Sequence, residues 1–74
     1  MSYIDLWKEI PEVMRGFNFE EYYRDEQNII KPALENLEYS NIRFSTGERD
    51  SFGPLSRIIT CNDREGNTVR FWYG

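Results

Sequence analysis

Residues 18–37, NFEEYYRDEQNIIKPALENL, carry the clearest helical pattern in the chain. Asn18 followed by Glu21 is a capping signature, and acidic residues at 20 and 21 suit a helix N-terminus. The apolar side chains recur at steps of three and four, which places them on one helix face. That face consists of Phe19, Tyr22, Tyr23, Ile29, Ile30, Ala33, Leu34 and Leu37. Glu26 is the only polar residue within it. We therefore expect a long helix that packs this face against a core.

Pro32 lies inside this helical stretch without changing the phase of its apolar residues. A proline removes one backbone hydrogen bond, and its ring crowds the carbonyl four residues earlier. The sequence therefore predicts either a kink near Asn28 or two abutting helices that share one face.

The residues before this stretch predict a first, shorter helix. Ser2 and Asp5 have the spacing of a capping box, and Pro11 suits the first turn of a new helical segment. Gly16 is a natural C-terminal stop. The apolar positions at helical spacing are Tyr3, Leu6, Trp7, Ile10, Val13, Met14 and Phe17.

After about Tyr39 the apolar period changes to two, which indicates strands. We expect a strand around Ile42 and Phe44, a second strand over residues 55–61 and a third over residues 68–73. Residues 62–67 should form a turn in which Gly66 adopts a positive φ. The prediction is a single α+β domain over residues 1–74, in the order α-α-β-β-β. Two N-terminal helices, the second kinked at Pro32, cover one face of a three-stranded antiparallel meander.

The residue types needed for common catalytic and metal sites are largely missing. The chain has no histidine and one cysteine, Cys61, which leaves no base for a cysteine nucleophile and too few ligands for structural zinc. No glycine-rich phosphate loop is present. The carboxylate pairs Glu20/Glu21, Asp25/Glu26 and Glu48/Asp50 are expected to be solvated on a polar face. We therefore expect no enzyme, no metal and no cofactor, and a core position for Cys61.

The net charge of −4 is unevenly distributed. Residues 1–40 contain nine acidic and four basic residues, whereas residues 41–74 contain four acidic residues and five arginines. An acidic row along the long helix can imitate phosphates, although a solvated face explains it with fewer assumptions. No apolar run is long enough to span a membrane, and no signal peptide is recognisable, so we expect a cytoplasmic protein without membrane contact.

Two groups of residues are candidates for binding. If the helices cover the Phe44 face of the sheet, the open face carries Arg43, Arg70 and Trp72. These side chains suit a protein interface, a nucleic-acid contact or a simple cation–π pair at the rim. In the long loop over residues 46–54, Phe52 near Arg49 is either an interface anchor or a cap over the core.

These observations favour a non-catalytic protein-binding module, a small accessory or inhibitory regulator of a larger protein. The profile also fits small proteins encoded by phages or mobile elements. The alternative is a single-stranded nucleic-acid binder that uses the open sheet face, although a net charge of −4 opposes phosphate binding. Because the sheet has open edges, a homodimer through an edge strand is a further expectation.

Overall fold

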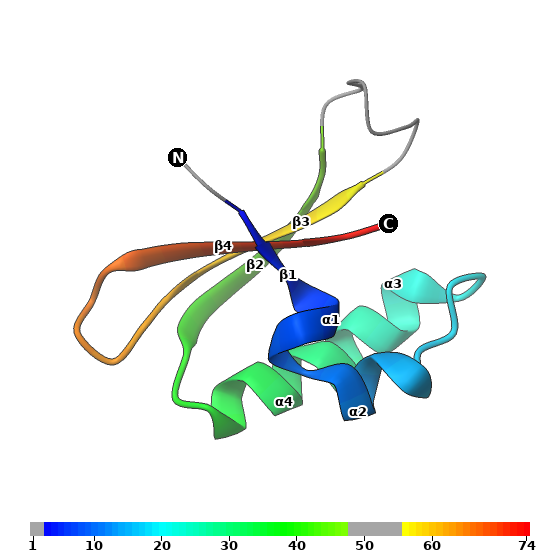
Figure 1. The fold of residues 1–74 in the computed structure, drawn as a ribbon, viewed down its shortest axis with the longest axis horizontal. Coiled ribbons are helices and arrows are strands. Elements are labelled where there is room, and N and C mark those ends of the chain that lie inside the picture. Colours follow the sequence, from blue (N-terminus) through cyan, green and yellow to red (C-terminus); the bar gives the residue numbers. More distant parts are fainter. Residues whose placement is uncertain (1–2, 48–55) are drawn as a thin grey trace.

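The computed structural model describes residues 3–47 and 56–74, which form an α+β domain with all helices on one side of a sheet (Figure 1). The helical elements are α1 (Leu6–Glu9), α2 (Pro11–Arg15), α3 (Tyr22–Asp25), the π-helical turn η1 (Glu26–Ile30) and α4 (Lys31–Asn36). The strands are β1 (Ile4–Asp5), β2 (Ser40–Thr46), β3 (Arg57–Asn62) and β4 (Thr68–Tyr73).

The sheet has four strands in the order β1-β4-β3-β2 and is mixed. The antiparallel meander of β2, β3 and β4 agrees with the sequence-based expectation. Gly66, in the turn between β3 and β4, has the expected positive φ, 86°. The predicted three-stranded, all-antiparallel sheet is wrong, however, because β1 adds a parallel strand beside β4, with Ile4 in register with Phe71.

The error at the N-terminus has a local cause. The spacing of Tyr3, Leu6 and Trp7 resembles a helix that begins near Ser2, which lies outside the described residues. In the structure the helix begins at Leu6, because the Asp5 side chain caps it by accepting the Trp7 N–H at 3.0 Å. The residues before that cap are extended and pair with β4. A strand of two residues is too short to show an alternating pattern in the sequence, so it could not be predicted.

The predicted long helix corresponds to α3, η1 and α4, which follow one another without a break. Around Asn28, where the sequence predicts a kink, the backbone widens into a π-helical turn in which Lys31 N–H bonds to the Glu26 carbonyl, five residues earlier. The turn ends just before Pro32, which has no N–H to continue the regular ladder. The two predicted helices are thus several short helical segments. Ile10 separates α1 from α2, which begins at Pro11.

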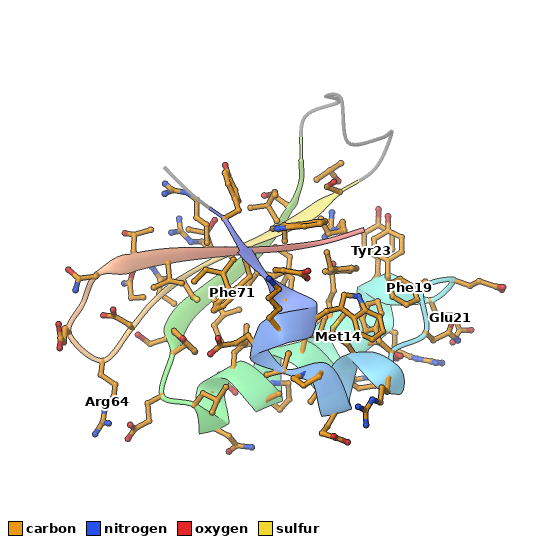
Figure 2. All side chains as sticks on the ribbon, viewed as in Figure 1. Met14, Phe19, Glu21, Tyr23, Arg64 and Phe71 are labelled. Atoms are coloured by element: carbon orange, nitrogen blue, oxygen red, sulfur yellow. The ribbon has the colours of Figure 1, made fainter. Side chains whose placement is uncertain are left out.

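The core lies between the helices and the sheet. Phe71, Ile59 and Cys61 point from the central strands toward the helices, and Leu34 and Ile30 meet them from the helical side. The buried apolar side chains are Leu6, Ile10, Met14, Phe17, Ile30, Leu34, Ile59, Cys61, Phe71 and Tyr73. Figure 2 shows Met14 and Phe71 between the two layers. No helix within the described residues is long and apolar enough to cross a membrane.

Candidate functional site

The sheet face turned away from the helices brings together three of the residues predicted for binding. Arg43 on β2 and Arg70 on β4 are both in register with Thr60 on β3. Trp72 lies two residues beyond Arg70 and therefore on the same face, in register with Ile58. Two strand spacings, about 10 Å, separate the backbones of the two arginines. Arg43 is exposed, and Arg70 and Trp72 are half-buried.

This open sheet face differs in charge from the rest of the chain. Alternation along the paired strands β2, β3 and β4 places eight residues on it: Arg43, Ser45, Ile58, Thr60, Asn62, Thr68, Arg70 and Trp72. Two of these eight are cationic, and β1 adds the acidic residue Asp5, which is in register with Trp72. The acidic residues of the N-terminal half lie mostly on the helical segments. Arg49 and Phe52, the other predicted binding residues, lie outside the described residues.

A buried ion pair joins the helical layer to the sheet. The Glu26 side chain on η1 is only 2% exposed, and the Arg57 side chain on β3 is 14% exposed. Arg57 donates from Nε to Glu26 Oε2 and from Nη2 to Oε1, both at 2.8 Å, and from Nη1 to Thr46 Oγ1 at 2.8 Å. The Tyr73 hydroxyl donates to Glu26 Oε2 at 2.5 Å. Both carboxylate oxygens therefore have partners, as a buried charge requires.

The protonation behaviour of this cluster follows from burial. The hydrogen bonds to Glu26 raise the pKa of the Arg57 guanidinium, which therefore stays charged. Burial raises the pKa of the Tyr73 hydroxyl, and its bond to Glu26 raises it further. The Arg57 guanidinium also lies 5.2 Å from the centre of the Tyr22 ring and 5.5 Å from that of Tyr23. The cluster fixes the helical layer over one end of the sheet.

The expectation that the Asp25/Glu26 pair is solvated is wrong. Asp25 is 5% exposed and Glu26 is 1% exposed. Asp25 Oδ2 accepts the Asn18 N–H at 2.9 Å, and Asn18 Oδ1 in turn accepts the Glu20 N–H at 2.9 Å. Asp25 therefore anchors the segment that leads into α3. The isolated position of Glu26 in an apolar helix face was the sequence signal for its burial; Asp25 gave no such signal.

Three aromatic side chains outside the predicted binding residues are exposed beside this anchored segment. Trp7 is 39% exposed, Phe19 47% and Tyr23 66%; together we call them the aromatic surface. The Trp7 and Phe19 rings stack at 6.3 Å, and Phe19 meets Tyr73 at 6.1 Å. Figure 2 shows Phe19 and Tyr23 at the same end of the molecule, with Arg64 at the other end. Phe19 is held in place because its neighbours Asn18 and Glu20 are both hydrogen-bonded.

Two further titratable side chains, Cys61 and Tyr39, are held within the fold. Cys61 is fully buried, and burial raises the pKa of its thiol to about 11, so it is neutral and shielded at neutral pH. Tyr39 donates to Glu9 at 3.1 Å, and mainly burial raises its pKa to about 12. Among residues 3–47 and 56–74, no three side chains of His, Cys, Asp or Glu lie close enough together to hold a metal ion.

No protein-family model, curated protein or solved structure matches this chain. A fold alone does not define a function, so the function is inferred from the two surfaces of this chain.

Proposed function

We propose that this protein is a non-catalytic protein-binding module, an accessory or inhibitory subunit of a larger protein. The observation that carries this proposal is the aromatic surface of Trp7, Phe19 and Tyr23. Grouped exposed apolar side chains often mark protein interfaces, and aromatic residues are enriched among the residues that dominate binding energy.

The contacts that hold the aromatic side chains in place also favour binding. Asp25 anchors the segment that carries Phe19, and the Arg57 guanidinium lies against the Tyr23 ring. Side chains that are already held in one arrangement lose less conformational entropy when a partner covers them. The exposed Glu20 directly follows Phe19, whereas Glu21 is ion-paired with the exposed Arg24 beside Tyr23. A partner with a polar rim of both charge signs around an apolar centre is therefore the best match.

Affinity purification of the tagged chain from its own cell tests this proposal, followed by measurement of the dissociation constant with the purified partner. Trp7→Ala and Phe19→Ala are each expected to weaken binding about 30-fold or more, as loss of a central aromatic does. Leu37→Ala is the matched control, because Leu37 is 47% exposed, as Phe19 is, but lies after α4. Equal binding by all three variants would contradict the role of the aromatic surface.

A second candidate function is single-stranded nucleic-acid binding by the open sheet face. The row of Arg43, Thr60 and Arg70 beside Trp72 favours it, since phosphates pair with arginine and bases stack on indole rings. A Trp7→Phe variant leaves Trp72 as the sole tryptophan, whose fluorescence should be quenched when oligothymidylate is added at low salt. Additional replacement Arg43→Ala should weaken that response. Unchanged fluorescence at saturating oligonucleotide would exclude this site.

A further inference from the structure

The outer edge of β2 is the long open edge of the sheet within the described residues. In the strand order β1-β4-β3-β2, the two-residue strand β1 covers the outer edge of β4 beside Phe71 and Trp72, so that edge is partly protected. The outermost strand on the other side is β2, with seven residues. An open edge exposes backbone N–H and C=O groups that can pair with another strand.

The side chains along this edge are incompletely covered. Phe44, Ile59 and Phe71 form one row across the helix-facing side of the sheet. Ile59 and Phe71 are fully buried, whereas Phe44 at the edge is only half-buried, and so is Ile42. A strand added beside β2 would cover both apolar side chains and satisfy the backbone groups next to them.

We propose that a second copy of this chain occupies the β2 edge, so that two four-stranded sheets join into one antiparallel sheet. A two-fold axis perpendicular to the sheet keeps both helical layers on the same side. It also requires that opposed residues come from the same face of the strand. The axis can therefore pass beside Arg43, Phe44 or Ser45, each residue then opposing its own copy.

Charge and the burial of Phe44 select among these registers. An axis at Arg43 would place two arginines directly opposite each other, which is unfavourable. An axis at Ser45 would set each half-buried Phe44 opposite the exposed, polar Thr46. An axis at Phe44 instead opposes the two Phe44 rings and sets Arg43 of each copy opposite Ser45 of the other. The β-bulge between Ser40 and Arg43, where Asn41 has a φ of 52°, lies outside these central pairs. The strand is therefore self-complementary about Phe44.

The dimer has a consequence for the proposed function. Because β1 is at the opposite edge of the sheet from β2, the stacked Trp7 and Phe19 rings that follow β1 stay outside the dimer contact. Each dimer would thus present two aromatic surfaces. Two linked binding surfaces raise the apparent affinity for a repeated or dimeric target without any new contact.

Sedimentation of the full chain over micromolar to millimolar concentrations tests the dimer, with matched substitutions at the exposed Ser45. Ser45→Glu places a carboxylate opposite each Arg43 and is expected to lower the dimer dissociation constant about tenfold, since two symmetric pairs form. Ser45→Arg places like charges there and is expected to raise that constant by a similar factor. Circular dichroism of each variant verifies that the fold is unchanged.

A concentration-dependent dimer that responds in opposite directions to the two substitutions supports the proposal. A monomer throughout the concentration range, or a dimer that responds equally to both substitutions, overturns the proposal. The β2 edge would then bind a different protein or no protein. The measurement uses the isolated chain, so a negative result would not affect the proposed binding through the aromatic surface.

Discussion

Replacing Arg57 with methionine is expected to lower the free energy of unfolding by about 3–5 kcal/mol. The change leaves the Glu26 carboxylate, whose side chain is 2% exposed, without its cation. Of its bonds to Arg57 and Tyr73, only that from the Tyr73 hydroxyl would remain. A domain of 74 residues has a total stability of only about 4–11 kcal/mol, so the variant should be close to unfolded. Urea unfolding followed by circular dichroism measures the loss.

The double variant Glu26→Leu with Arg57→Met is the control that separates charge from packing. Replacing a whole buried ion pair with apolar side chains of similar volume is often neutral or stabilising, so the double variant should recover part of the lost stability. The recovery is incomplete because the buried Tyr73 hydroxyl loses its acceptor, and the further change Tyr73→Phe should remove that cost. Glu26→Leu alone should cost less than Arg57→Met alone, because Arg57 is 14% exposed and can turn toward water. If Arg57→Met costs less than about 1 kcal/mol, the pair does not join the helices to the sheet as described.

The sequence predicts the elements whose patterns repeat over several turns or several residues. The apolar face of residues 18–37 predicts the helix, and the alternation of Val69, Phe71 and Tyr73 with Arg70 and Trp72 predicts β4, whose bounds are those expected. The same alternation correctly separates the covered sheet face from the open one. These features can be predicted because each depends on a local periodicity of apolar residues that repeats several times along the chain.

The features that the sequence misses depend on contacts between distant residues. The two residues of β1 are too few to show alternation, and their strand character depends on β4, which is far along the chain. The Glu26 and Arg57 side chains meet across 31 residues of sequence. Glu26 is conspicuous in its apolar face, yet nothing local identifies its partner. The aromatic surface is missed for a related reason, since Trp7 and Phe19 both fit core positions in a helical pattern.

Phe71→Ala is expected to cost about 3–5 kcal/mol, the usual loss for a buried phenylalanine. Phe71 is fully buried, lies in register with Ile59 on one side and Ile4 on the other, and packs edge-on against Tyr39 with the ring centres 5.4 Å apart. Because such a loss approaches the whole stability of the domain, Phe71→Leu provides a milder variant that should remain folded. Thermal and urea unfolding of both variants give the free-energy change.

Phe44→Ala turns this measurement into a test of the strand order. Phe44 and Phe71 occupy the same row of the sheet, two strands apart. If β4 were an edge strand, as in a three-stranded meander, the two rings would occupy equivalent edge positions and their removal would cost similar amounts. With β1 beside β4, Phe71 is enclosed on both sides whereas Phe44 remains half-buried, so Phe44→Ala should cost about half as much. Equal losses, measured at a concentration where the chain is monomeric, would contradict the greater enclosure of Phe71 that the four-stranded order gives.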